Sequence, residues 1–208
     1  MLGISLSALV GYLLGSFPSG FIAGWIAGID VREAGSGNIG ATNVTRLLGK
    51  RFGYPVFALD FAKGAVAVIL SMLLAKNQGA RESLVELHGA VAGVFSVIGH
   101  SYSIWLSFKG GKGVATTIGV LFGLNWIAAI IVCVVWYLTF QITRYVSLAS
   151  IAAALALPGA IAAMLLLGRL NTPMLLYFSL CLTALVIFRH RSNLSRLVRG
   201  TEPRVLRK

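Results

Sequence analysis

Seven apolar stretches follow one another along this 208-residue sequence, and most are long enough to cross a membrane as a helix. The hydrocarbon layer of a bilayer is about 30 Å thick and is spanned by about 20 helical residues. Hydrophobic residues make up 57% of the chain and charged residues only 12%, and a soluble domain of this size could not bury that much apolar surface. Nothing alternates like a barrel strand. The sequence therefore predicts an all-α, polytopic membrane protein.

The expected spans are separated by short polar segments. They cover residues 4–29, 54–75, 84–107, 114–123, 126–141, 147–167 and 173–188, and the fourth is short. The first has no basic residues ahead of it and no Ala-x-Ala cleavage site, so we expect it to remain as a span. We expect a single membrane domain over residues 1–208, with a short basic tail from about residue 189.

The positions of the basic residues predict the orientation, because Lys and Arg in short loops are retained on the cytoplasmic side. With the N-terminus outside and the C-terminus cytoplasmic, only Lys76, Arg81 and Arg169 of the 18 basic residues lie outside, and the cytoplasmic set includes Lys63, Arg207 and Lys208. The net charge of +12 favours contact with anionic membrane lipids. The tail is too short to form a nucleic-acid-binding domain.

The first polar motif, residues 35–46, lies between the first two expected spans. It contains Ser36, Gly37, Asn38, Gly40, Thr42, Asn43 and Arg46. Glycine permits positive φ and a close approach of backbone N–H groups to an anion, and the polar side chains add hydrogen bonds. The guanidinium of Arg46 suits phosphate oxygens. The pattern predicts a phosphate site, and a glycine-rich turn with Asn caps is the simpler alternative.

The second motif, residues 108–117, places Lys109 and Lys112 among three glycines directly before an apolar helix. The N-terminus of a helix favours an anion, so the lysines and the helix predict a second phosphate site. The spacing excludes a Walker A loop, because Gly113 follows Lys112 and Leu106 stands where a glycine is needed. The alternative is that the lysines bind no ligand and are present only because basic residues are common in cytoplasmic loops.

The third motif, residues 189–196, contains His190 and Asn193 at an i, i+3 spacing. If the last helix continues through it, the two side chains share one face and could orient a hydroxyl or a phosphate. A solvated helix end with basic neighbours is the equally simple alternative.

Other ionisable residues within the spans are expected to be structural. Asp60 and Lys63 are one helical turn apart and predict an intrahelical ion pair. His100 could bridge packed helices, and His88 lies near the outer end of the third span. The cysteines and histidines have no metal-type spacing, so we expect no metal site and no cofactor.

Familiar arrangements for covalent catalysis are missing from the sequence. It has no G-x-S-x-G elbow, and Asp30 and Asp60 are its only aspartates, which leaves too little acid for a Ser–His–Asp triad. No His is followed by Asp five positions later. Glycine amides, Arg, Lys and Asn instead favour the positioning of phosphates and electrostatic stabilisation.

These motifs resemble the acyl-phosphate-dependent glycerol-3-phosphate acyltransferases of bacteria, the PlsY family. The matching residues, in the order and spacing of that family, are 35–46, Gly99-His100 through Phe108-Lys109-Gly110-Gly111-Lys112-Gly113 with Ala115-Thr116, Ser147-Leu148, and His190-x-x-Asn193-x-x-Arg196-Leu197. The sequence departs from the family pattern at Ser103 and Ile39, where proline is usual. Both changes concern backbone shape more than chemistry.

The resemblance implies a seven-helix enzyme of the bacterial inner membrane with an active site at the cytoplasmic face. It would transfer an acyl group from acyl phosphate to glycerol 3-phosphate, giving 1-acyl-glycerol 3-phosphate (lysophosphatidic acid) and inorganic phosphate, without a covalent intermediate. By this likeness Ser36, Gly37 and Asn38 line a hole for a phosphate, with Gly40, Thr42 and Asn43 nearby. Arg46, Lys112, Ser147, His190 and Asn193 hold the two substrates, assisted by Lys109 and Arg196. Other enzymes of phospholipid synthesis are further candidate partners.

Two other functions compete with the enzyme. A transporter or channel for phosphate esters also uses glycine-broken helices and buried basic groups. It requires polar groups reachable from both sides, whereas the expected outer loops contain few. A scaffold subunit of a lipid-synthesis complex would leave three phosphate-suited motifs without a task.

Overall fold

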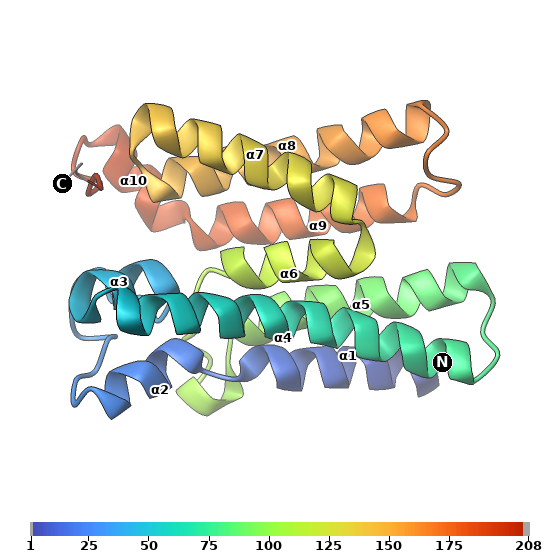
Figure 1. The fold of residues 1–208 in the computed structure, drawn as a ribbon, viewed down its shortest axis with the longest axis horizontal. Helices are drawn as coiled ribbons and strands as arrows, with labels where there is room; N and C mark the ends of the chain where they lie inside the picture. Colours follow the sequence, from blue (N-terminus) through green and yellow to red (C-terminus); the bar gives the residue numbers. More distant parts are fainter. Residues whose placement is uncertain (1, 206–208) are drawn as a thin grey trace. The chain divides into compact units, whose positions relative to one another are not determined.

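The computed structural model describes residues 2–205, and every regular element within them is a helix (Figure 1). The elements are α1 (Leu2–Ser16), α2 (Ser19–Ile26), α3 (Ala41–Leu48), α4 (Lys50–Asn77), α5 (Glu82–Ser101), the 3-10 turn η1 (Ile104–Leu106), α6 (Val114–Leu124), α7 (Trp126–Thr143), α8 (Val146–Leu166), α9 (Met174–Arg189) and α10 (Arg191–Val198). The all-α prediction is confirmed. Arg207 and Lys208 lie outside the described residues.

The chain divides into two compact units, one ending at Leu124 and the other beginning at Asn125. Unit 1 contains α1 to α6, and unit 2 contains α7 to α10. The first and second motifs belong to unit 1, whereas Ser147 and the third motif belong to unit 2. The expectation of a single domain stays a prediction.

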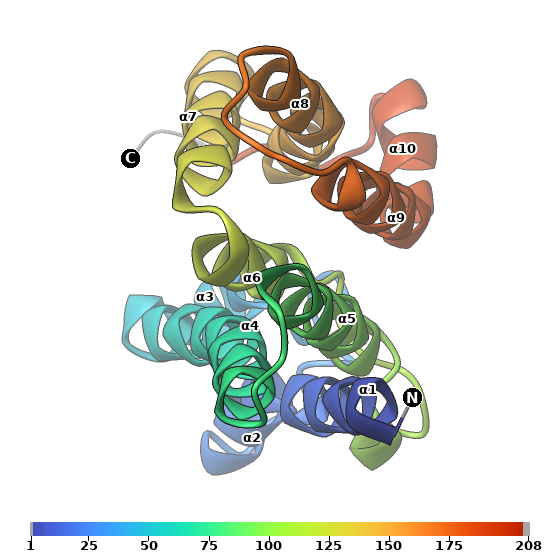
Figure 2. The same cartoon turned by 90° about the vertical axis from the view of Figure 1, so that its right-hand side faces the viewer.

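Glycines bring the helices of unit 1 into backbone contact. Figure 2 shows α1, α4, α5 and α6 of this unit end on. A Cβ at Gly11 of α1 would overlap the backbone of Ala92 in α5. A Cβ at Gly64 of α4 would likewise overlap the carbonyl oxygen of Thr116 in α6. Small residues allow this approach, and close packing holds helices together where lipid removes the hydrophobic drive between them.

In unit 2, α8 packs against both α7 and α9. The Thr183 hydroxyl of α9 donates to the carbonyl oxygen of Ala154 in α8 at 2.7 Å. The Trp136 indole of α7 donates to the Ser150 hydroxyl of α8 at 3.2 Å. Polar side chains within these apolar helices therefore pair across their interfaces, where no water is available to them.

Each of the seven expected spans falls on helical segments. Within residues 2–205, five segments are long and apolar enough to cross a membrane, and α9 with α10 forms a sixth candidate that is bent by 57°. The first of the five, Leu2–Ile26, agrees with the first expected span and is interrupted between α1 and α2 at Phe17 and Pro18. Helix α6 has only 11 residues, about half the length of a span. The number of crossings stays a prediction.

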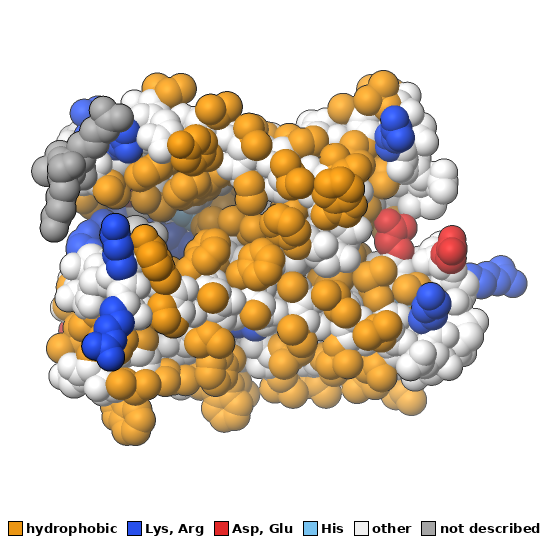
Figure 3. Space-filling model, in the orientation of Figure 1, with side chains coloured by type: hydrophobic (Ala, Val, Ile, Leu, Met, Phe, Trp, Pro, Cys, Tyr) orange, Lys and Arg blue, Asp and Glu red, His pale blue; other side chains and the backbone are white. Residues whose placement is uncertain are grey.

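Large hydrophobic side chains lie exposed along the helices, as the orange surface of Figure 3 shows. On α4 alone, Phe57, Val66, Ile69 and Leu73 are each between 45% and 53% exposed. An apolar surface of this extent is unfavourable in water and rare on soluble proteins, whereas lipid chains solvate it. The surface therefore fits a polytopic membrane protein.

The position of Lys63 differs from the one expected from the sequence. Lys63 was expected among the cytoplasmic basic residues, but it lies inside α4, is 7% exposed, and pairs with Asp60 at 2.8 Å. A paired lysine within a span carries no information about which loops face the cytoplasm. The ion pair predicted from the spacing is confirmed.

The glycine contacts predict opposite effects for the same substitution at two sites. Gly11→Ala should lower the melting temperature in detergent, because its methyl group overlaps the Ala92 backbone and overpacking destabilises by about 1–3 kcal/mol. Gly159→Ala in α8 has open space around it and should preserve or raise the melting temperature, by removing a helix-interior glycine. Equal melting temperatures for the two variants would contradict this account of the packing.

Candidate functional site

The segment 35–46 forms a tight loop followed by α3. Gly35 and Gly37 have φ of 63° and 67°, a region that glycine adopts without a steric penalty. The Asn43 amide nitrogen donates to the carbonyl oxygens of Val31 and Ala34 at 3.0 and 3.1 Å, and its oxygen accepts the Ser36 N–H at 2.9 Å. Asn43 is 2% exposed. This asparagine therefore shapes the loop from inside, and its predicted place near a bound phosphate stays a prediction.

The other residues of the first motif lie at the surface of the loop. Ser36, Gly37, Thr42 and Arg46 are exposed, and Asn38 and Gly40 are half-buried. The Asn38 side-chain oxygen accepts the Gly40 N–H at 2.8 Å, directly before α3 begins. The loop presents hydroxyl and amide groups at the start of α3, which is a suitable setting for an anion, whereas Arg46 lies in the last turn of that helix.

The second motif is folded back on the C-terminal end of α5. Ser107 and Phe108 have positive φ of 50° and 62°, which reverses the chain after η1. The N–H groups of Gly110 and Gly111 then donate to the carbonyl oxygens of Ser101 and His100. Lys109 is exposed and Lys112 is half-buried, and both precede α6 as the sequence predicts.

The structure brings the first and second motifs together within unit 1. Ile39 of the first motif and Leu106, just before the second, belong to one buried hydrophobic cluster with Val31, Val44 and Val56. The two departures from the family pattern have local roles here. Ile39 is 3% exposed in this cluster. Ser103 has φ of −65°, a value that proline also adopts, and its hydroxyl donates to the Ser16 carbonyl oxygen at 2.6 Å.

In unit 2, the third motif and Ser147 gather around a residue that sequence reasoning missed, Glu202. Its carboxylate accepts from the Asn193 amide at 2.7 Å and from Arg196 Nε at 2.8 Å. The Ser147 hydroxyl faces the same carboxylate without reaching ordinary hydrogen-bond geometry. The sequence did hold one signal for this role: Glu202 is one of only six acidic residues, and it lies in a basic tail. Only the fold shows that the tail returns to Asn193.

The third motif is not the straight helical continuation considered in the sequence analysis. Helix α9 ends at Arg189, and α10 leaves it at an angle of 57°. His190 and Asn193 are nevertheless both buried, at 2% and 4% exposure, so the alternative of a solvated helix end is wrong. His190 Nδ1 lies 2.8 Å from the Val186 carbonyl oxygen, a pure acceptor, which places the proton on Nδ1.

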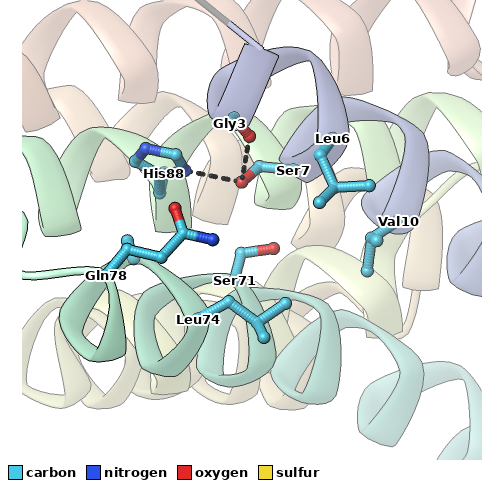
Figure 4. Close-up of a pocket in the computed structure, with 9 residues that line it drawn as sticks. Gly3, Leu6, Ser7, Val10, Ser71, Leu74, Gln78 and His88 are labelled. Atoms are coloured by element: carbon cyan, nitrogen blue, oxygen red, sulfur yellow. Dashed lines mark hydrogen bonds between the residues drawn. The ribbon is translucent and has the colours of Figure 1, made fainter.

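A further polar cluster of unit 1 lies apart from these motifs (Figure 4). The Ser7 hydroxyl of α1 meets His88 Nδ1 of α5 at 2.8 Å and donates to the Gly3 carbonyl oxygen. Ser71 and Gln78 of α4 complete the lining, and the cavity has room for about one water molecule. His88 has the structural role that the sequence predicts, in the packing of α1 against α5.

Electrostatics favour a charged Glu202. Burial alone would raise the pKa of this carboxyl group, but the polar contacts from Ser147, Asn193 and Arg196 lower its pKa below the ordinary value of 4.5. The half-buried Asp30 carboxylate pairs with Arg32 at 2.6 Å, which lowers the pKa of Asp30 as well. Both acids are thus matched to basic partners near the predicted site residues.

The fold defines the class of protein as an α-helical integral membrane protein whose polar motifs gather hydrogen-bond donors. A family model for glycerol-3-phosphate acyltransferase matches residues 5–200. A glycerol-3-phosphate acyltransferase of Synechococcus elongatus is 43% identical over 99% of this chain and 96% of its own length. One from Staphylococcus aureus is 39% identical, covering 95% of each chain.

Two solved structures of PlsY (YgiH), an integral membrane glycerol 3-phosphate acyltransferase, are also similar. Both are 38% identical to this chain and cover 98% of it. The glycerol 3-phosphate form has a TM-score of 0.85 and is covered over 96% of its length. The lysophosphatidic acid form has a TM-score of 0.81 and is covered over 95%.

The chain therefore belongs to the glycerol-3-phosphate acyltransferase family, of the PlsY type. It is an acyltransferase of phospholipid synthesis, and the resemblance identified from the motifs is confirmed. This assignment decides against the transporter and the scaffold subunit.

Glu202→Gln should lower the melting temperature at pH 7 by about 3 °C, the shift expected for a loss of about 1 kcal/mol in a chain of this size. The folded-state pKa is lowered, so the ionised carboxylate stabilises the fold above pH 4.5. This contribution is lost as the pH falls through the folded-state pKa, and the difference from wild type should shrink at a pH of about 3.

Glu33→Gln, which changes an exposed acid, is the control and should melt like wild type at both pH values. A Glu202→Gln variant as stable as wild type at pH 7 would show that the tail contacts do not hold the fold.

Proposed function

We propose that this enzyme takes its acyl group from an acyl phosphate and transfers it directly to glycerol 3-phosphate. The products are 1-acyl-glycerol 3-phosphate and inorganic phosphate. The observation that carries the proposal is that Ile39 of the first motif and Leu106, just before the second, share one buried cluster in unit 1. The two glycine-rich segments joined in this way contain Arg46, Lys109 and Lys112. The similar PlsY structures, in a glycerol 3-phosphate form and a lysophosphatidic acid form, support the acceptor and the product.

The chemistry of the donor supports transfer without an enzyme nucleophile. An acyl phosphate is an activated anhydride whose leaving group, inorganic phosphate, is already good. The glycerol hydroxyl oxygen bonds to the acyl carbonyl carbon, the bond from that carbon to the phosphate oxygen breaks, and a substrate phosphate oxygen accepts the hydroxyl proton. The enzyme then has to align two anions and offset their charge, which donors and cations achieve.

Residue roles follow from exposure and chemistry. Ser36, Gly37 and Asn38 hold one phosphate, with Thr42 and the half-buried Gly40 beside them. Asn43 supports this loop from within, through its hydrogen bonds to Val31, Ala34 and Ser36.

The cations and the third motif act on both substrates. Arg46 and Lys112 offset charge on the phosphate and carbonyl oxygens, and Lys109 adds to the positive potential. In unit 2, Ser147, His190 and Asn193 orient the substrates, and Arg196 acts through Glu202, which it contacts at 2.8 Å.

The proposed location is the bacterial inner membrane, with the N-terminus outside and the active site at the cytoplasmic face. Membrane lipids surround the exposed apolar helices, and other enzymes of phospholipid synthesis are candidate partners. The retention of basic residues on the cytoplasmic side supports this orientation.

Single cysteines in a background with Cys133 and Cys181 replaced by serine should report the orientation. Cysteines at Ser107 and Arg199, both exposed, should react with a membrane-impermeant maleimide only in inside-out vesicles. A cysteine at the exposed Gln78 should react only in intact cells. Labelling of Ser107 and Arg199 variants from opposite sides would contradict a common active-site face.

The donor is tested with purified protein in detergent. Given glycerol 3-phosphate and, separately, acyl phosphate, acyl-CoA or acyl carrier protein, the enzyme should form lysophosphatidic acid only with acyl phosphate. Phosphate release should match product formation one to one. Product from acyl-CoA alone would overturn the donor assignment.

Lys112→Ala should reduce kcat at saturating acyl phosphate by about 100-fold, because a preorganised cation contributes most to the charge that develops during the reaction. Lys76→Ala, which removes an exposed lysine of α4, should leave kcat within about twofold of wild type. A Lys112→Ala enzyme with normal turnover would remove this lysine from the mechanism.

A further inference from the structure

A buried carboxylate lies where α2, α4 and α5 meet in unit 1. Asp60 is 2% exposed, and its Oδ1 accepts from the Ser19 hydroxyl at 2.6 Å and from Lys63 Nζ at 2.8 Å. His100 Nδ1 faces the same oxygen at 3.5 Å. Lys63 also donates to the carbonyl oxygen of Phe17, at the break between α1 and α2. An ion pair within α4 explains only the contact with Lys63, so the other contacts point to a further task.

One contact leads to the first motif. Ser19 begins α2, and the next residue, Gly20, packs so closely against the carbonyl oxygen of Ile39 that a Cβ would overlap it. Ile39 lies between the Asn38 and Gly40 pair that closes the glycine-rich loop. The hydrogen bond from Ser19 to Asp60 therefore fixes the part of α2 on which the first motif rests.

The other contact leads to the second motif. The His100 carbonyl oxygen accepts the Gly111 N–H at 2.9 Å, and a Cβ at Gly111 would overlap the His100 imidazole. A Cβ at Gly110 would overlap the His100 carbonyl oxygen. Residues 109–113 thus pack directly against His100, and the His100 ring faces Asp60.

We propose that Asp60 is a positioning residue that holds the two glycine-rich motifs at a fixed separation. This role rests on the proposed function of the motifs in binding the two substrates. A buried ion pair is often no more stabilising than apolar side chains of the same volume. A carboxylate facing donors from three helices instead sets geometry, and a displacement of about 1 Å in a catalytic group can lower a rate by about 100-fold.

The matched test compares two buried serines. Ser19→Ala removes the hydroxyl that Asp60 accepts, whereas Ser96→Ala removes an equally buried hydroxyl that bonds only to Gly93 in its own helix. With acyl phosphate as donor, Ser19→Ala should lower kcat about 10-fold with KM values within about twofold, since alignment matters most in the transition state. Ser96→Ala should keep wild-type kcat. Equal kcat values for the two variants would overturn the proposal.

A distance measurement without substrate separates this proposal from that of the donor. Spin labels on Glu33→Cys and Ser107→Cys, both at exposed positions, with Cys133 and Cys181 replaced by serine, report the separation of the two motifs. Asp60→Asn should broaden the distance distribution and lower kcat by about 100-fold. An unchanged distribution would overturn the proposal even if kcat fell. Where Asp60→Asn does not fold, Ser19→Ala carried in the labelled protein gives the same readout against Ser96→Ala.

Discussion

The carboxylate of Asp60 is buried among apolar helices, where an uncompensated charge would be strongly unfavourable. It is stable there because Lys63 and Ser19 donate to it and His100 faces it. The requirement to satisfy this charge constrains where α2, α4 and α5 can lie. Both glycine-rich motifs of unit 1 rest on residues adjoining these contacts, so we infer that the geometry of the two loops depends on Asp60.

Unit 2 repeats this arrangement with a different acid. The tail folds back onto α10, so that the Glu202 carboxylate accepts hydrogen bonds from Asn193 and Arg196. The chain has only six acidic residues against 18 basic ones. Two of the six are buried: Asp60 faces donors from α2, α4 and α5, whereas Glu202 accepts from two residues of α10. In the proposed mechanism, such internal acids would hold polar groups in place before a substrate binds, which reduces the reorganisation needed for the reaction.

Much of the candidate site was predictable because its residues are close in sequence. The segments 35–46 and 108–113 carry their chemistry in local order, and the spacing of Asp60 and Lys63 predicts their ion pair. Contacts between distant segments were not predictable. The inward position of Asn43 depends on Val31 and Ala34, and the role of Glu202 depends on the return of the tail. The break between α1 and α2 did have a local signal, because Pro18 disfavours helical backbone at the residue before it.

The sequence by itself determined that the chain is helical and polytopic, because lipid demands long apolar segments with internally satisfied backbones. It also determined the enzyme family, since short motifs retain the order of their donors. Only the tertiary structure decided which polar residues face outward and which support them from inside. Burial and hydrogen bonding join segments far apart in the chain, and no local pattern records those partners.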